Sequence, residues 1–211
     1  MEAALVVLAA GEGRRAGGPK AWKLVRGRPW LAHQLEALSE LRLASIVAVL
    51  GEPPPETPRG LLAGLRWAIN LRPELGPFSS LQIGLSESPP DMPVFVLPVD
   101  VPVPGLPVFE ALCGAFHAAW KRRVVPAAGA AAGRRTGSPL LAAVPLFKGR
   151  GGHPVLLAAE ACGELLRMDV ASPGARLDVW LRSQGPRITR LETGDERVVT
   201  NLNTAKDFGM A

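Results

Sequence analysis

Short apolar runs alternate along the first half of the chain with segments in which apolar residues recur at helical spacing. The continuous runs predict strands that are buried on both faces, as in a parallel sheet covered by helices. They occupy residues 4–9, 45–51 and 93–100. The helical spacing predicts helices at residues 29–41, 78–88 and 108–120. This alternation predicts an α/β fold, a three-layer Rossmann-like domain with a mostly parallel sheet.

The second half of the chain has a less regular pattern. Further strands are predicted at residues 122–127 and 187–192, on both sides of residues 149–154, and in a run that ends near residue 71. Further helices are predicted at residues 60–67, 156–167 and 173–183, and from residue 204 onward. Residues 127–139, rich in alanine and glycine, are predicted to form a loop. We expect one domain over residues 1–211, because this length fits a single hydrophobic core.

The composition argues against several classes of function. Apolar residues make up 47% of the chain, yet no uncharged apolar stretch is long enough to span a membrane and no signal sequence is recognisable. We therefore expect a cytoplasmic protein without a membrane partner. The net charge of +5 comes from scattered basic residues without interleaved aromatics, a pattern that suits an anionic small molecule better than nucleic acid. Cys113 and Cys162 lack the spacing of a metal site or a disulfide framework and are expected to be buried thiols.

The segment after the first predicted strand combines glycine with positive charge. Residues 10–20 read AGEGRRAGGPK. Glycine lets the main chain approach a phosphate, exposed N–H groups form a concave donor surface, and Arg and Lys neutralise the charge. A flexible turn alone needs no arginine, so the segment indicates an anion site. It lacks the Gly-Lys-Ser/Thr ending of a P-loop, and the next predicted helix begins too late for a G-x-G-x-x-G unit.

Six sequence blocks follow one another in an informative order. The first consists of LAAG, Arg15, Gly17, Pro19-Lys20 and Gly27-Arg28-Pro29, and the others are GPFSSLQIGL (76–85), VLPVDVPVP (96–104), GGHPVLL (151–157), PGARLDVWL (173–181) and TNLNTAKDF (200–208). Together they span most of the chain and resemble the blocks of the MobA-like nucleotidyltransferases. That family includes molybdenum cofactor cytidylyltransferases and molybdopterin guanylyltransferases. The resemblance implies a sheet of the nucleotide-diphosphate-sugar transferase type.

The resemblance also implies an activity. Members of this family transfer NMP from an NTP to a phosphorylated acceptor and release pyrophosphate, with magnesium as the cofactor. Residues 151–157 and 173–181 resemble the cytidylyltransferase branch, which favours CTP over GTP and makes molybdopterin or its molybdenum-loaded form the expected acceptor. The alternatives are a guanylyltransferase of the molybdopterin-guanine dinucleotide type, a transferase for another small phosphometabolite, and a nucleotide-binding accessory protein without turnover.

The residues that match the family blocks receive expected roles. Arg15 and Lys20 are expected to hold the triphosphate and stabilise the charge that grows during transfer, and Asp100 to bind magnesium at the end of its strand. These three are the predicted catalytic residues. The predicted nucleotide-binding residues are Leu8, Ala9, Ala10, Gly11, Gly13, Arg15, Lys20 and Ser80. The structural alternatives are an Asx-turn before Pro102 for Asp100 and a helix cap for Ser80.

Three further residues are candidates for the site. Asn201 and Asn203 stand where cytidylyltransferases often have aspartates, whereas the guanylyltransferase branch has asparagines there. Asn203 is therefore a second candidate metal ligand, and capping of the final helix is the alternative. His153 lies between Gly152 and Pro154 in a glycine-rich turn, and we expect it to contact the acceptor.

Overall fold

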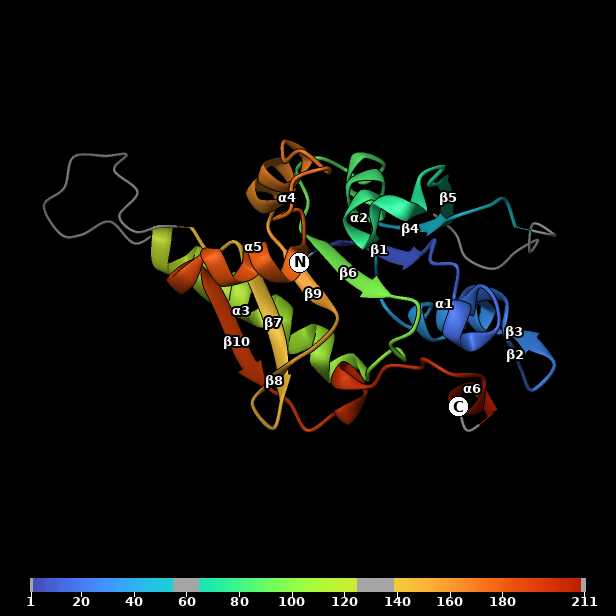
Figure 1. The fold of residues 1–211 in the computed structure, drawn as a ribbon. Helices are drawn as coiled ribbons and strands as arrows, with labels where there is room; N and C mark the ends of the chain where they lie inside the picture. The colour runs from blue at the N-terminus through green and yellow to red at the C-terminus, as the bar shows by residue number, and fades with distance from the viewer. Residues whose placement is uncertain (1, 55–64, 125–138, 210–211) are drawn as a thin grey trace, which may run out of the picture.

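The computed structural model describes residues 2–54, 65–124 and 139–209. One sheet contains eight strands: β1 (Ala4–Ala9), β4 (Ser45–Leu50), β5 (Leu65–Ile69), β6 (Val94–Pro98), β7 (Ala142–Phe147), β8 (Arg150–Gly151), β9 (Val155–Leu157) and β10 (Ile188–Glu192). Their order is β10-β7-β9-β6-β1-β4-β5, with β8 paired to β7 (Figure 1). Only β8 and β9 run antiparallel to their neighbours among the described strands of this sheet. The predicted mostly parallel sheet is confirmed.

Helices cover both faces of this sheet. The helices of the described chain are α1 (Trp30–Leu38), α2 (Pro77–Ser86), α3 (Leu106–Val124), α4 (Ala159–Leu166), α5 (Leu177–Ser183) and α6 (Ala205–Gly209), of which α6 lies against the hairpin strand β2 (Leu24–Val25). Gly84 of α2 lies against Val6 of β1, whereas the ring of Phe109 in α3 meets Phe95 of β6 edge-on at 5.1 Å. Val6 pairs with the residue after Phe95, so Val6 and Phe95 point to opposite faces of the sheet. The sheet therefore lies between two helical layers, as the three-layer prediction requires (Figure 1).

The first half of the chain follows the predicted pattern closely. The three continuous apolar runs correspond to β1, β4 and β6, and the three helical segments to α1, α2 and α3. A two-stranded hairpin, β2 (Leu24–Val25) and β3 (Arg28–Pro29), separates the glycine segment from α1. The central strand β1 is almost entirely buried, because it pairs with β4 on one side and β6 on the other.

The strand predicted at residues 122–127 is wrong over its described part, because α3 continues to Val124. A short run that includes β-branched residues at the end of a helix cannot be distinguished from a strand by periodicity alone. The remainder of that prediction, and the loop predicted at residues 127–139 up to residue 138, lie outside the described residues.

Three predicted helices have different bounds in the structure. The helix expected from residue 156 begins at Ala159, because the residues before it form β9. The helix expected from residue 173 begins at Leu177. The helix expected at residues 60–67 is wrong from Leu65 onward, where β5 begins, and residues 60–64 lie outside the described part of the chain. β9 is buried on both faces, which favours a strand there. β5 is half-buried at the edge of the sheet and is held as a strand by its pairing with β4.

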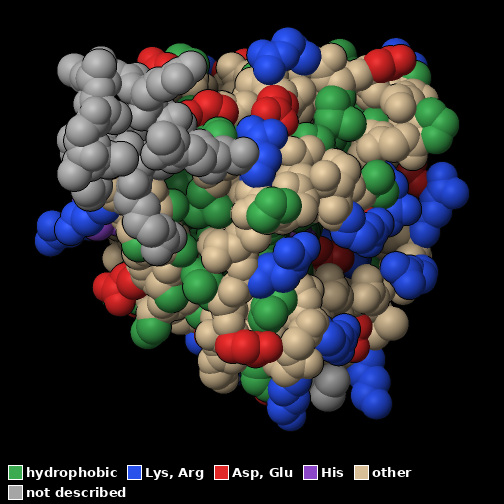
Figure 2. Space-filling view, turned by 90° about the vertical axis from the view of Figure 1, so that its left-hand side faces the viewer, with side chains coloured by type: hydrophobic (Ala, Val, Ile, Leu, Met, Phe, Trp, Pro, Cys, Tyr) green, Lys and Arg blue, Asp and Glu red, His purple; other side chains and the backbone are tan. Residues whose placement is uncertain are grey.

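The predicted burial of the thiols is confirmed for Cys162 and is wrong for Cys113. None of the described helices is long and apolar enough to cross a membrane. On the face shown in Figure 2, Lys and Arg side chains are scattered among hydrophobic and acidic ones. Cys162 is a buried free thiol in α4, and burial raises its pKa to about 12, whereas Cys113 in α3 is a free thiol that is only half-buried.

The close contact between α2 and β1 predicts the effect of adding one methyl group. A Cβ atom at Gly84 would overlap Cγ1 of Val6 and lie 3.1 Å from Cγ2 of Val49. Gly84→Ala should therefore lower the free energy of unfolding by roughly 1–3 kcal/mol, measured by urea denaturation. Gly114→Ala is the control, because a Cβ there meets nothing within 4 Å on an exposed part of α3, and this variant should be about 0.5–1 kcal/mol more stable. Equal stabilities of the two variants would contradict this packing.

Candidate active site

The segment that follows β1 folds back on itself through glycines with positive φ. Gly13 (φ 61), Gly17 (φ 73) and Gly18 (φ 129) adopt backbone conformations that side chains rarely tolerate. The carbonyl oxygen of Gly13 accepts hydrogen bonds from the N–H groups of Ala16 and Gly18 at 2.8 and 3.1 Å. A Cβ atom on Gly13 would overlap the carbonyl group of Gly18, so this turn needs glycine for space as well as for φ.

Three segments that are distant in the sequence meet beyond the ends of β1 and β6. The ammonium group of Lys20 donates to Oδ2 of Asp100 at 2.8 Å and to Oδ1 of Asn203 at 3.0 Å. Nη2 of Arg15 lies 3.4 Å from the same amide oxygen of Asn203. We refer to these four residues as the Lys20 cluster. The structure thus brings together two basic side chains, which the sequence predicts to bind a nucleotide, and two side-chain oxygens, which it predicts to bind a metal ion.

The Lys20 cluster is partly withdrawn from solvent. The side chains of Lys20 and Asp100 are 14% and 24% exposed. Their attraction is therefore screened less by water and salt than that of a surface ion pair. The carbonyl oxygen of Asp100 also accepts a hydrogen bond from the N–H of Leu202 at 2.8 Å. That bond ties the backbone beside Asn203 to the loop that carries Asp100.

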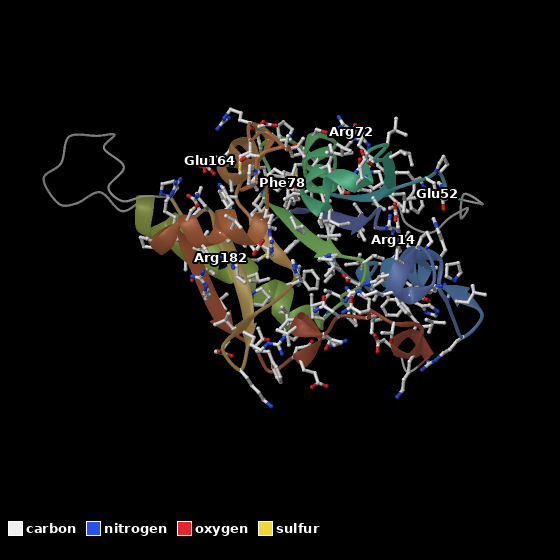
Figure 3. The ribbon with its side chains drawn as sticks, in the orientation of Figure 1. Arg14, Glu52, Arg72, Phe78, Glu164 and Arg182 are labelled. Carbon is white, nitrogen blue, oxygen red and sulfur yellow. The ribbon has the colours of Figure 1, made fainter. Side chains whose placement is uncertain are left out.

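Other loops end at the same carboxyl edge of the sheet as this cluster. The loops after β1, β4 and β5 lie along the same edge, where Arg14, Glu52 and Arg72 are found (Figure 3). A Cβ atom on Gly11 would meet nothing within 4 Å, so the backbone there is accessible. Four predicted nucleotide-binding residues occupy the end of β1 and the first two positions after it: Leu8, Ala9, Ala10 and Gly11.

Ser80 belongs to a buried polar network that the sequence analysis did not identify. Its hydroxyl oxygen accepts a hydrogen bond from Nδ2 of Asn70 at 2.9 Å, and the same amide donates to Oγ of Ser79 at 2.8 Å. Asn70 directly follows β5 and is 1% exposed. The helix-cap alternative for Ser80 is wrong, because Ser80 lies inside α2 and Gly76 is the residue that precedes the helix. The signal for Asn70 was its position as a polar residue at a strand end on the ligand-binding edge.

Asn203 does not cap the final helix with its side chain. Oδ2 of Asp207 accepts hydrogen bonds from the N–H groups of Asn203 and Thr204 at 2.7 and 2.8 Å. Both bonds, of which that from Thr204 has the larger effect, lower the pKa of the Asp207 carboxyl from its ordinary value of 3.8. The side-chain oxygen of Asn203 is thereby left to Lys20 and Arg15. The capping alternative for Asn203 is wrong.

His153 lies at the same edge of the sheet and is half-buried. Its backbone N–H donates to the carbonyl oxygen of Val198 at 2.8 Å, and Nδ1 of its imidazole ring lies 3.4 Å from the carbonyl oxygen of Val96. Burial lowers the pKa of this imidazole below 6.5, while the Val96 carbonyl and the charge of Asp100 oppose that shift. The ring is therefore mainly neutral at pH 7 and can donate or accept a hydrogen bond without carrying charge.

A separate cavity of about 580 Å³ lies against the end of β7, lined by Phe147 and residues 194–197. Arg197 and Asp195 form an ion pair there at 2.7 Å, and the same carboxylate accepts a hydrogen bond from the N–H of Gly105 at 2.8 Å. The charge of Arg197 is thus matched within the protein, and Glu196 adds a negative charge to the lining. The Lys20 cluster is the better candidate for binding a phosphate, because it lies beside the glycine turn.

Comparisons with known proteins give one family match and several structures with a similar fold. A family model described as the MobA-like NTP transferase domain matches residues 5–187. No curated protein matches the chain. The solved structures described below are less than 25% identical to this chain, so they establish the fold only.

Three of these proteins illustrate the likeness. Rv0371c from Mycobacterium tuberculosis H37Rv is 18% identical, with 99% of this chain and 96% of that chain covered and a TM-score of 0.67. A second structure of Rv0371c, in complex with manganese, is 18% identical, with 92% and 88% covered and a TM-score of 0.62. The 2-C-methyl-D-erythritol 4-phosphate cytidylyltransferase from Thermus thermophilus is 19% identical, with 99% and 96% covered and a TM-score of 0.60. Molybdopterin-guanine dinucleotide biosynthesis protein A from Archaeoglobus fulgidus is 19% identical, with 97% and 94% covered and a TM-score of 0.62.

The hydrogen bonds of Asn203 and Asp207 predict different consequences for two substitutions. Asn203→Ala should lower the free energy of unfolding by less than the roughly 0.5–2 kcal/mol that loss of an N-cap costs, because its side chain caps nothing. Asp207→Ala should lower the melting temperature, because two N–H groups lose their acceptor. Thermal unfolding of both variants at pH 7 measures this difference. A larger loss in Asn203→Ala than in Asp207→Ala would contradict the assignment.

The same pair of variants predicts a pH dependence. The pKa of Asp207 is lowered in the folded state, so its contribution to stability is present above the ordinary value of 3.8 and is lost as the pH falls through the lower folded-state pKa. The difference in melting temperature between the wild type and Asp207→Ala should therefore shrink as the pH is lowered below about 3.8.

Proposed function

The chain belongs to the MobA-like NTP transferase family, and we propose that it transfers NMP from an NTP, preferentially CTP, to a phosphorylated acceptor and releases pyrophosphate. The proposed acceptor is molybdopterin or its molybdenum-loaded form. The observation that carries this proposal is the meeting of Lys20, Arg15 and Asp100 beside the glycine turn at the carboxyl edge of the sheet. As a nucleotidyltransferase, the protein must neutralise the charge that develops on transferred and departing phosphates.

The proposed reaction needs positive charge more than it needs an acid or a base. A phosphate oxygen of the acceptor forms a bond with the α-phosphorus of the NTP, and the bond from that phosphorus to the bridging oxygen of the departing pyrophosphate breaks. The electron pair of the broken bond leaves with pyrophosphate, so negative charge grows there. Lys20 and Arg15 would stabilise this charge, and the backbone from Ala10 to Gly13 would hold the phosphates through its N–H groups.

The residues of the Lys20 cluster fit a divalent cation. The carboxylate oxygen of Asp100 and the amide oxygen of Asn203 already accept hydrogen bonds from one ammonium group, so both oxygens face a single cationic centre. Among the described residues, no group of three or more His, Cys, Asp or Glu side chains is arranged to hold a metal ion. Magnesium commonly takes one or two protein oxygens and completes its shell with phosphates and water. We propose Asp100 and Asn203 as its ligands, and magnesium would supply charge neutralisation on the phosphates.

Other residues at the carboxyl edge of the sheet would bind the nucleotide and the acceptor. Leu8, Ala9 and Gly11 border the proposed nucleotide site, and Ser80 would contribute from the first turns of α2. His153 would contact the acceptor as a neutral imidazole. The choice of CTP and of a molybdopterin acceptor is supported by the resemblance of residues 151–157 and 173–181 to cytidylyltransferase blocks. A guanylyltransferase of the same family is the alternative.

Substitution of the two basic groups tests the proposal. Lys20→Ala and Arg15→Ala should each lower kcat/KM by about 10²–10³-fold, the range for loss of a group preorganised toward developing charge. Pyrophosphate release would be measured with magnesium, each NTP and molybdopterin. Arg14→Ala is the matched control, because Arg14 is exposed, pairs with Glu12 and lies next to Arg15, and its rate should equal that of the wild type.

Two outcomes would contradict this function. Wild-type rates in Lys20→Ala and Arg15→Ala would reject their roles. An NTP that raises the melting temperature of the wild-type protein while no pyrophosphate is released with any acceptor would favour a nucleotide-binding accessory protein.

The proposed metal ligands predict the effect of a second carboxylate. Asn203→Asp places a charged oxygen where the amide oxygen lies 3.0 Å from the Lys20 ammonium group. Because hard cations prefer charged oxygen ligands, the magnesium concentration for half-maximal activity should fall. The measurement is a magnesium titration of pyrophosphate release, with Asn201→Asp as the control, since Nδ2 of Asn201 bonds to Val199 rather than to the cluster. An unchanged titration curve for Asn203→Asp would leave Asp100 as the single proposed protein ligand.

A further inference from the structure

The loop that carries Asp100 is held by one buried glutamine of α1. Nε2 of Gln34 donates to the carbonyl oxygen of Val101 at 2.7 Å and to that of Val99 at 3.3 Å. Oε1 of Gln34 accepts a hydrogen bond from the N–H of Val103 at 3.0 Å. The side chain is 2% exposed, and its bonds reach the backbone on both sides of Asp100. Gln34 therefore holds the segment from which the carboxylate projects.

The sequence of this loop explains why side chains must hold it. Pro102 and Pro104 lack N–H groups, so the segment cannot complete a regular ladder of backbone hydrogen bonds. Val99, Val101 and Val103 are buried, with exposures of 1–8%, so water cannot satisfy their carbonyl oxygens. A buried carbonyl without a donor is costly, and donors from α1 satisfy two of these groups.

Trp30 lies one helical turn before Gln34 and connects the same loop to the C-terminal helix. Its indole N–H donates to the carbonyl oxygen of Val99 at 2.6 Å. Its ring meets the ring of Phe208 edge-on, with centroids 5.9 Å apart at an interplanar angle of 80°. Phe208 is 4% exposed and lies in α6, which begins two residues after Asn203. Trp30 thus contacts both segments that supply an oxygen to Lys20.

We propose that Trp30 and Gln34 are positioning residues of the Lys20 cluster. They hold the oxygens of Asp100 and Asn203 close enough together for both to bind Lys20 and a divalent cation. This proposal rests on the proposed function of that cluster. The side-chain hydrogen bonds of both residues go to the backbone of residues 99–103 and not to the cluster itself, so both act through the backbone or through α6. Residues that orient metal ligands from outside the coordination shell commonly change metal affinity or activity 10–100-fold when they are replaced.

A purely structural role for Gln34 makes a different prediction, and the chain contains a suitable control. Gln82 in α2 also donates from Nε2 to two backbone carbonyls, those of Leu165 at 2.9 Å and Met168 at 2.7 Å. These bonds join α2 to the α4 region and involve no residue of the Lys20 cluster. Gln34→Leu and Gln82→Leu therefore remove similar bonds from different places. If Gln34 serves stability alone, the two variants should behave alike.

The first measurement is hydrogen exchange, which does not depend on any activity. In Gln34→Leu the amide of Val103 should exchange about tenfold faster, since its acceptor is removed, whereas Gln82→Leu should leave this amide unchanged. Trp30→Phe is a milder variant that keeps a ring against Phe208 and removes the indole donor. It keeps the proposal testable if Gln34→Leu folds poorly, and it should speed exchange in residues 99–103 without doing so in α6.

The second measurement separates positioning from stability in the reaction. In Gln34→Leu, kcat should fall about 10–100-fold and the magnesium requirement should rise, while KM for the NTP stays within about twofold. Trp30→Phe should change the same quantities in the same direction. Gln82→Leu should change the melting temperature only. Equal effects of Gln34→Leu and Gln82→Leu on kcat and on the magnesium requirement would overturn the proposal, as would unchanged exchange at Val103.

Failure of the proposed function has a distinct signature. If the wild-type protein releases no pyrophosphate, the shift in melting temperature produced by magnesium alone becomes the readout. A shift that is lost in Gln34→Leu and kept in Gln82→Leu would still support the positioning role. The same shift in both variants would overturn it.

Discussion

The parallel pairing of β1 with β6 is the constraint on which the rest of the site depends. Leu8 pairs with Pro98, so the two strands end side by side at the same edge of the sheet. The glycine turn after β1 and Asp100 after β6 are therefore neighbours, although they are far apart in the sequence. Both strands are buried among apolar residues, and a shift of register would expose that surface to water. The packing of the core thus decides the distance between Lys20 and Asp100.

Contacts of the C-terminal segment complete the cluster. The N–H of Leu202 bonds to the carbonyl oxygen of Asp100, and Phe208 packs against Trp30. The same segment is anchored upstream, where a Cβ on Gly152 would overlap the carbonyl group of Val198. A chain segment with little regular structure can place Asn203 reproducibly, because several contacts on both sides restrict its backbone. Such restriction is what an electrostatic site requires, since preorganised groups need not move when charge develops.

Prediction succeeded where the signal was local. The runs that became β1, β4 and β6 are continuously apolar, and no other element of that length buries both faces so simply. It failed at a boundary between elements. The strands predicted on both sides of residues 149–154 are present as β7 and β9, but the next helix begins at Ala159 and not at residue 156, because β9 extends to Leu157 between two strands. Ser80 shows the same limit in the site: serine near a helix start is typical of a cap, yet Asn70 binds it inside α2.

The amino-acid sequence by itself determined which segments are buried and where glycine and positive charge coincide, because burial patterns and backbone freedom are local properties of the residues. Together with the resemblance to the family blocks, these properties identified Arg15, Lys20 and Asp100 as a set. Only the tertiary structure decided that the side chain of Asn203 turns toward Lys20 while Asp207 binds the helix N–H groups. Only the fold placed Gln34 beneath the loop of Asp100. Helical periodicity shows that a residue faces the core, but its hydrogen-bond partner 60 or more residues away depends on how the strands and helices pack.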